Sequence, residues 1–127
     1  MKFMYRYTRV RVWLYRKFFS NIRKLKFTGK ILQATQFIGT GEIFAQNVEL
    51  GVFPSPYFTN GVGYIEARNT TAKIEILDNT FINNNFVMIA DRTKITIGRR
   101  CLIGTNFFVT DSDFHGLAIN NRTNGNY

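Results

Sequence analysis

Cysteine, proline and histidine are scarce in this sequence of 127 residues, and each scarcity excludes a class of structure. The single cysteine, Cys101, rules out an intrachain disulfide and a zinc site built from several cysteines, and no metal site is predicted. With 2 prolines and 45% hydrophobic residues, the composition is not that of a disordered chain. No apolar run approaches the roughly 18 residues that a transmembrane helix needs.

Acidic residues are absent from the first 30 positions, although the chain contains 8 Asp and Glu and has a formal net charge of +9. Ten of the 17 Lys and Arg fall within residues 1–30. The other seven are balanced by the eight acids, so the basic character belongs to the N-terminal segment. We therefore expect a basic segment over residues 1–30 and a near-neutral domain over residues 31–127.

Apolar side chains recur at helical spacing along the basic segment. The recurring positions are Phe3, Tyr7, Val10, Leu14, Phe18, Ile22 and Leu25. Steps of three and four residues place them on one face of an α-helix, and most of the cations fall elsewhere around it. The pattern predicts a basic amphipathic helix with residues 27–30 as its exit and linker.

Three roles for this helix are open. In the first role, the helix packs on the neighbouring domain or on another subunit. In the second, it lies on a membrane with its aromatic rings at the acyl boundary and its cations on anionic headgroups. The third role is binding of nucleic acid, but no recognised nucleic-acid motif follows the basic segment. We expect no nucleic-acid partner, and any peripheral membrane contact would be made through residues 1–26.

From residue 37 onward, the helical period gives way to a period of six. An apolar residue opens each unit, a small residue often follows, and polar residues come next. The opening positions are 44, 50, 76, 82, 88, 97, 103 and 109. A loop at residues 91–93 interrupts this period, and so does the segment 52–73, where a protruding loop precedes a strand that resumes at residues 63–67.

A unit of six residues is a short strand plus a turn, and three such units close a coil of about 18 residues. Stacking the coils at strand spacing pairs three sets of apolar residues, namely Ile76 with Ile97, Ile82 with Ile103, and Met88 with Val109. Glycine in the second position would take the positive φ of a tight corner. The period predicts a parallel β-helix, and the alternative is a β-sandwich or jelly roll, whose strands would alternate with period two.

The segment around residues 95–115 carries the most specific motif. Ile97-Gly98 and Ile103-Gly104 lead into an aliphatic strand and then an Asp- and Ser-rich stretch that ends in His115. This motif resembles the hexapeptide-repeat O-acetyltransferases, which act on maltose, galactosides and sugars of surface polysaccharides. The likeness covers about residues 37–122.

The resemblance implies an all-β fold, a left-handed parallel β-helix of hexapeptide repeats preceded by the N-terminal basic amphipathic α-helix. It implies acetyl-CoA as the acyl donor, a hydroxyl of a sugar or surface-glycan precursor as the acceptor, and a homotrimer as the assembly. It also implies a cytoplasmic location and a role in polysaccharide biosynthesis. The basic helix would then hold the protein at the inner face of the membrane.

Transfer of an acetyl group to a hydroxyl requires a base, and a free imidazole with a pKa near 6.5 suits this task. The resemblance makes His115, the only histidine, the general base. Asp113, Asp111 or a neighbouring carbonyl group would orient its other ring nitrogen. The alternatives are that His115 is a solvated loop histidine and that the two aspartates only form turns.

The remaining predicted site residues would contact the acceptor. They are Asn84, Asn85, Asp91 and Arg122. The asparagines and Asp91 would hydrogen-bond sugar hydroxyls, or else form a corner ladder that is only structural. Arg122 would bind an anionic group in bidentate fashion, or cap a surface. Cys101 is expected to be a buried core thiol and not a nucleophile.

The sequence departs from the family after His115. Family members continue with several more coils that form most of the acetyl-CoA groove, whereas residues 120–127 are polar and contain no hexad. This ending indicates a C-terminally truncated copy with incomplete coils, or a short form whose site is completed by neighbouring subunits. The alternative function is a non-catalytic truncated β-helix module that binds a glycan, a membrane surface or a partner protein.

Overall fold

A computed structural model describes residues 1–123 of the chain. One long helix precedes a series of short parallel strands, and a single 3₁₀ turn follows them. The elements are α1 (Lys2–Phe18), β1 (Lys24–Ile31), β2 (Thr35–Gly39), β3 (Glu42–Leu50), β4 (Gly63–Ala67), β5 (Lys73–Ile76), β6 (Phe81–Ile82), β7 (Val87–Ala90), β8 (Lys94–Ile97), β9 (Leu102–Ile103), β10 (Phe108–Thr110) and η1 (Ile119–Asn121).

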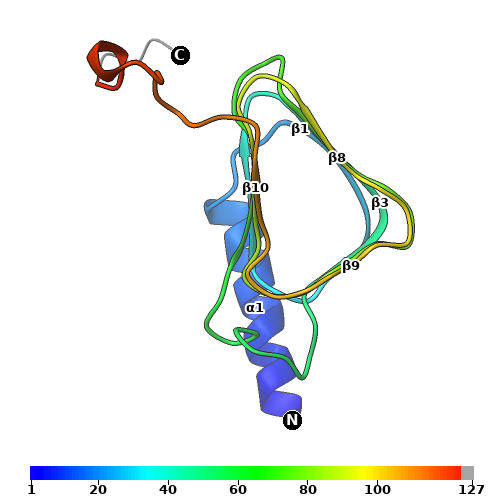
Figure 1. Ribbon diagram of the computed structural model, residues 1–127. Coiled ribbons are helices and arrows are strands. Elements are labelled where there is room, and N and C mark those ends of the chain that lie inside the picture. The colour runs from blue at the N-terminus through cyan, green and yellow to red at the C-terminus, as the bar shows by residue number, and fades with distance from the viewer. Residues whose placement is uncertain (124–127) are drawn as a thin grey trace.

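The strands form two sheets in which every recorded pair is parallel. Sheet A has the order β8-β5-β3-β6-β9, with β1 paired to the other side of β3, and sheet B has the order β10-β7-β4-β2. Figure 1 shows sheet A curving around one side of the molecule, while sheet B runs along the other side and α1 lies outside it. The two sheets share one hydrophobic core.

The predicted fold class, an all-β left-handed parallel β-helix of hexapeptide repeats, is wrong. The chain instead forms two parallel sheets preceded by an N-terminal helix. The hexads opening at positions 44 and 50 predict separate strands on either side of a corner. Instead, β3 is continuous over nine residues and pairs with β5 near its start and with β6 at its end. This long strand joins the flanking strands into one curled half-barrel sheet.

The predicted pairing of apolar residues one repeat of 21 residues apart is confirmed for three pairs of strands, β5 with β8, β6 with β9 and β7 with β10. Ile76 pairs with Ile97, Ile82 with Ile103, and Met88 with Val109. The two predicted interruptions are also confirmed, since residues 51–62 form a long loop between β3 and β4, and residues 91–93 connect β7 to β8. The period of six therefore predicted which strands are neighbours.

The helix is shorter than the sequence predicts. It ends at Phe18, and the N–H of Phe19 donates to the carbonyl group of Tyr15 at 3.2 Å. Two side chains beyond it bind β2, because Ser20 Oγ accepts from Phe37 N at 3.0 Å and Asn21 Oδ1 accepts from Gly39 N at 2.9 Å. These contacts turn the chain from the helix onto sheet B.

Residues 24–31 are the first strand of sheet A and not the end of a helix or a linker. Ile22, which the helical spacing places on the apolar face of α1, is 8% exposed and belongs to the hydrophobic core. Leu25 packs against the same core from β1. Part of the basic segment is thus built into the sheet domain.

Alternate side chains of the strands fill the space between the sheets. The largest fully buried apolar residues are Phe37, Ile43, Val48, Leu50, Ile65, Ile74, Ile76, Ile82, Phe86 and Met88. Burial of each such side chain stabilises the fold by about 1.5–3 kcal/mol relative to exposure. A Cβ atom added to Gly63 would lie 2.3 Å from the ring of Phe86, so the packing requires glycine at that position.

Asparagine as well as glycine makes the positive-φ corners. The non-glycine corner residues are Asn47, Asn79, Asn85, Arg100 and Asn106, with φ between 50° and 63°. Asparagine tolerates this left-handed region better than most residues, and its amide can bond to the next turn. Gly51, the second residue of its hexad, has a φ of 95° as predicted, whereas Gly98 and Gly104 have no positive φ.

Candidate functional site

His115 follows β10 on a segment that leaves sheet B, and its side chain is exposed. In Figure 1 this segment runs from β10 away from the sheets toward η1. Nδ1 of His115 lies 3.1 Å from the carbonyl oxygen of Gly116. When Nδ1–H donates to this oxygen, the lone pair of Nε2 is left to accept a proton from another molecule. The neighbouring carbonyl group is thus the orienting acceptor in this arrangement.

Phe114 gives the segment a defined backbone turn next to the imidazole. Its φ is 60°, a left-handed conformation that bulky residues rarely adopt. The guanidinium of Arg68 lies 4.4 Å from the centre of the Phe114 ring, in the geometry of a cation–π contact. This contact holds the turn before His115 against the end of β4.

Arg68 itself is held by a polar row along β4. Its Nε donates to Glu66 Oε1 at 2.8 Å, and Tyr64 Oη donates to Glu66 Oε2 at 2.9 Å. Glu66 is only 8% exposed, and these donors satisfy the oxygens of its carboxylate. Burial, together with the carboxylate of Glu66, raises the pKa of Tyr64 above its ordinary value.

None of Tyr64, Glu66 and Arg68 is among the predicted site residues. The available signal is the alternation of Tyr64, Glu66 and Arg68 with the core residues Ile65 and Ala67, which places three polar side chains on the outer face of one strand. Nothing in the sequence indicates that this face meets Phe114.

Asp111 binds the loop that connects β7 to β8. Its Oδ1 accepts from Asp91 N at 2.6 Å, while its Oδ2 accepts from Thr93 N at 2.9 Å, from Thr93 Oγ1 at 2.6 Å and from Arg92 N at 3.3 Å. Burial acts to raise the pKa of this carboxyl, but the four hydrogen bonds outweigh it and lower the pKa to about 2. Asp111 therefore fastens a neighbouring loop, which is neither the orienting contact with His115 nor the local turn that the sequence left open for it.

Asp91 lies in the same cluster and is 2% exposed. Its Oδ1 accepts from Asn69 Nδ2 at 3.1 Å and lies 3.9 Å from a guanidinium nitrogen of Arg68. Its Oδ2 lies 3.5 Å from Nε of Arg92. The structure thus brings Asp91, Asp111 and Arg68 together at the end of sheet B from which the His115 segment departs.

Asn84 is wholly buried and has a structural role. Its Nδ2 donates to the carbonyl oxygens of Val52 and Pro56, each at 2.9 Å, and its Oδ1 accepts from Val52 N at 3.1 Å. One side-chain amide thereby satisfies three backbone groups of the long loop (residues 51–62). Its polar atoms are used within the chain.

Asn85 belongs to a corner ladder. Its Nδ2 donates to Asn106 Oδ1 at 2.7 Å, and its N–H donates to Gln33 Oε1 at 2.6 Å. Both Asn84 and Asn85 precede β7, whereas Asp91 follows it, so the two asparagines lie at the opposite end of sheet B from the Asp111 cluster. The structure does not bring them to His115.

The other predicted site residues lie in the segment after β10 or near it. Asp113 is exposed, and no hydrogen bond joins it or Asp111 to His115 among the described residues. Arg122 follows η1 and is exposed, with its N–H donating to the carbonyl oxygen of Ile119 at 3.4 Å. Cys101 is only half-buried, so the expectation of a buried core thiol is wrong.

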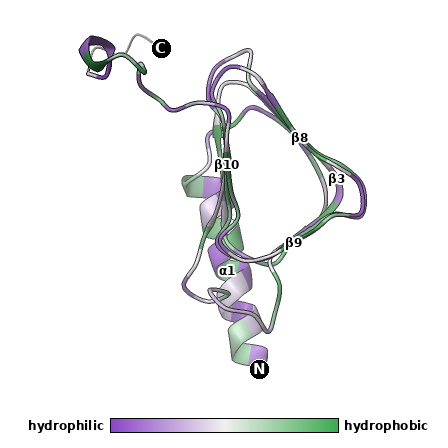
Figure 2. Cartoon of the chain, in the orientation of Figure 1, coloured by the Kyte–Doolittle hydropathy of each residue, from purple (hydrophilic) through white to green (hydrophobic). Residues whose placement is uncertain are grey.

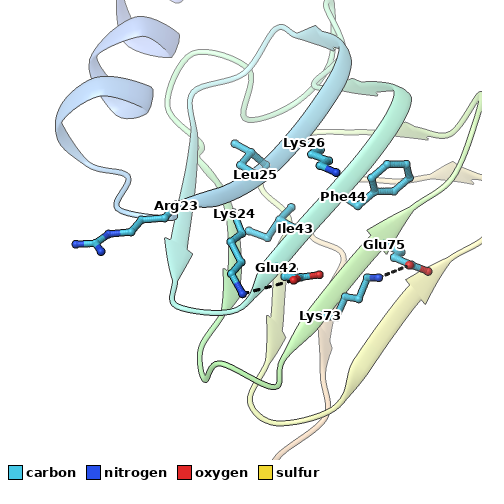
Figure 3. Close-up of a pocket in the computed structure, with 9 residues that line it drawn as sticks. All are labelled: Arg23, Lys24, Leu25, Lys26, Glu42, Ile43, Phe44, Lys73 and Glu75. Carbon is cyan, nitrogen blue, oxygen red and sulfur yellow. Dashed lines mark ion pairs between the residues drawn. The ribbon is translucent and has the colours of Figure 1, made fainter.

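A basic groove of about 520 Å³ lies on the outer face of sheet A, far along the chain from His115. Figure 3 shows Arg23, Lys24 and Lys26 beside it on the β1 side and Lys73 on β5, with β3 between the two strands. Some of its charge is compensated, since Lys24 pairs with Glu42 at 3.6 Å and Lys73 pairs with Glu75 at 3.0 Å. The groove is not lined by any of the predicted site residues.

Within residues 1–123, no group of three or more His, Cys, Asp or Glu side chains is arranged to hold a metal ion. The cluster at the end of sheet B consists instead of the carboxylates of Asp91 and Asp111 with the guanidinium groups of Arg68 and Arg92, and the exposed imidazole of His115 lies on the segment that departs from it. Such groups can move a proton and orient a hydroxyl. Comparison with models of protein families, with curated proteins and with solved structures finds no match to this chain.

Proposed function

We propose that the protein is an acetyl-CoA-dependent O-acetyltransferase that acetylates a hydroxyl of a sugar or surface-glycan precursor, with His115 as the general base. The observation that carries this is the contact of His115 Nδ1 with the carbonyl oxygen of Gly116, at 3.1 Å, on an exposed side chain. When Nδ1–H donates in this contact, Nε2 carries the lone pair that a base uses.

The chemistry needs one proton transfer in each direction. Nε2 of His115 removes the proton of the acceptor hydroxyl as the hydroxyl oxygen attacks the thioester carbonyl carbon. A carbon–oxygen bond forms, the carbon–sulfur bond breaks, and the imidazolium returns the proton to the sulfur of the departing CoA. The products are the O-acetyl ester and free CoA, and no oxidant or metal is consumed.

Fixed neighbours support this role of the imidazole. Arg68 holds the Phe114 ring, and Asp111 attaches the chain just before this turn to the loop at residues 91–93. Arg122, which directly follows η1, would bind an anionic group of the acceptor. The homotrimer implied by the family resemblance belongs to the same proposal, with a neighbouring chain facing His115.

The test is an assay of acetyl transfer from acetyl-CoA to a panel of sugars and glycan precursors. The reaction is measured by the release of the CoA thiol and by the increase in mass of the acceptor. His115→Ala and His115→Gln should lower the rate by about 10²–10⁴-fold. Arg99→Gln, an exposed change on another corner, is the control and should leave the rate unchanged. Equal rates for the wild type and both His115 variants would show that the base is a different group.

A second measurement separates the catalytic role from the alternative of a non-catalytic module. Acetyl-CoA is titrated calorimetrically into the wild-type protein after circular dichroism has verified that it is folded. Heat of binding is expected for the transferase. If the folded protein binds a glycan but no acetyl-CoA, the alternative of a non-catalytic binding module is correct.

A further inference from the structure

The helix α1 packs on the rest of the chain through one side. Thr8 is 5% exposed, and Arg11 donates to the carbonyl oxygens of Thr59 and Gly61 in the long loop. Val12 lies near Phe37 at a groove between α1 and the sheets. These contacts fix the orientation of the helix, and with it the direction of its other faces.

Most of the apolar stripe along α1 points away from the sheets, although Leu14 is half-buried. On this stripe Phe3 is 82% exposed, Val10 is 56% exposed and Phe18 is 62% exposed. Tyr7, on the same stripe, and Trp13, beside it, are about half exposed. A contiguous group of exposed apolar side chains of this size marks a surface that binds a membrane or another molecule.

The stripe is bordered by cations for which residues 1–123 provide no ion-pair partner. Lys2, Arg6, Arg9 and Lys17 are exposed, and residues 1–30 contain no Asp or Glu. Nζ of Lys17 lies 4.9 Å from the ring centre of Trp13, so a cation and a large aromatic ring share one surface. Figure 2 shows apolar and polar residues interleaved along α1.

We propose that α1 docks the protein on an anionic lipid surface and lies in the plane of the interface. The exposed rings would enter the boundary between headgroups and acyl chains, and the cations would contact the anionic headgroups. A nucleic acid would satisfy the cations but would leave the stripe of Phe3, Val10 and Phe18 in water. None of the helices among residues 1–123 has the length and apolarity to pass through a bilayer, which agrees with a helix that lies on the surface.

Sedimentation with sucrose-loaded vesicles tests this docking surface on the full chain. One vesicle type is phosphatidylcholine alone, and the other contains about 30% phosphatidylserine, which provides the negative surface potential. Arg6→Gln/Arg9→Gln should weaken binding to the anionic vesicles by about fivefold per cation, and so by about 25-fold. Val10→Ser/Phe18→Ser, which changes no charge, should weaken it by about tenfold or more.

A matched double variant controls for net charge. Arg99→Gln/Arg100→Gln removes two exposed arginines from a corner between β8 and β9 and should bind the anionic vesicles within about threefold of the wild type, since charges beyond a Debye length of the surface contribute little. Docking through α1 is overturned if this control loses as much affinity as Arg6→Gln/Arg9→Gln. It is also overturned if Val10→Ser/Phe18→Ser binds normally, or if an oligonucleotide at equal salt binds more tightly than the vesicles.

Discussion

The carboxylate of Asp111 binds Thr93 twice, with Oδ2 accepting both the backbone N–H at 2.9 Å and the hydroxyl at 2.6 Å. Asp111 directly follows β10, and Thr93 directly precedes β8, so the contact fastens the end of β10 to the start of β8. The His115 segment begins immediately after this attachment. Stability and the placement of the proposed base are thus linked at one side chain.

Asp111→Asn should lower the free energy of unfolding at neutral pH by about 1–2 kcal/mol, because charge-assisted hydrogen bonds become neutral ones at a solvent-screened site. The effect should depend on pH. The pKa of Asp111 is lowered from 3.8 to about 2, so its ionised form stabilises the fold fully above about pH 4 and loses this contribution as the pH falls toward 2.

Urea unfolding of the wild type and of Asp111→Asn between pH 7 and pH 2 measures this difference. The two proteins should differ most above about pH 4 and converge near pH 2. Asp113→Asn is the matched control, since no hydrogen bond of Asp113 is recorded, and should have little effect at any pH. A constant difference across the range would mean that Asp111 does not act through its charge.

How much the sequence predicts is clearest at the strands. The spacing of Ile76, Ile82 and Met88 from their partners one repeat later predicts three parallel pairs, because a fixed period places equivalent residues side by side. It does not predict that β3 runs on through the corner at Asn47. That continuity depends on β1 lying along the whole of β3, a contact made by a segment that the sequence assigns to the end of the helix and a linker.

The helix shows a second limit. Ile22 and Leu25 continue the helical spacing of α1, but the helix stops before them because Ser20 and Asn21 bind the backbone of β2. A polar pair of this kind ends a helix only when acceptors and donors of another element lie near it. The same limit applies to the site, where His115 is evident as the only histidine but the contact of Arg68 with Phe114 is a product of the fold.

Asn84→Ala should destabilise the protein by about 2–4 kcal/mol, because three backbone groups of the long loop would lose their partner in a buried environment. The loop should also become more susceptible to limited proteolysis between residues 51 and 62. Asn83→Ala is a neighbouring control, since Asn83 is partly exposed and makes only a local contact. An unchanged unfolding midpoint for Asn84→Ala would contradict the structural role.

Gly63→Ala should cost about 1–3 kcal/mol of stability, because the new methyl group would overlap the wholly buried ring of Phe86. Gly104→Ala makes the same chemical change where no atom lies within 4 Å of the added Cβ, so it should be neutral or stabilising by up to about 1 kcal/mol. Thermal unfolding of both variants gives the comparison. Equal midpoints would show that the Phe86 ring has room to move.

Arg68 and Phe114 should act as positioning residues for His115. Arg68→Lys keeps a positive charge beside Glu66 but removes the planar group from the Phe114 ring, and Phe114→Leu removes the ring itself. Either change should lower kcat of the proposed transfer by about tenfold, since a misplaced base transfers its proton poorly. The KM for the acceptor and the unfolding midpoint should change little.

A readout that does not depend on activity comes from the single histidine. Diethyl pyrocarbonate modifies only one imidazole in this chain, so the rate of carbethoxylation reports how His115 is presented. Arg68→Lys and Phe114→Leu should change this rate by a similar factor, because both release the same turn. Phe108→Leu, at a ring that is 61% exposed on β10, is the matched control and should leave the rate unaltered. If all three variants react like the wild type, the cation–π contact does not position the imidazole.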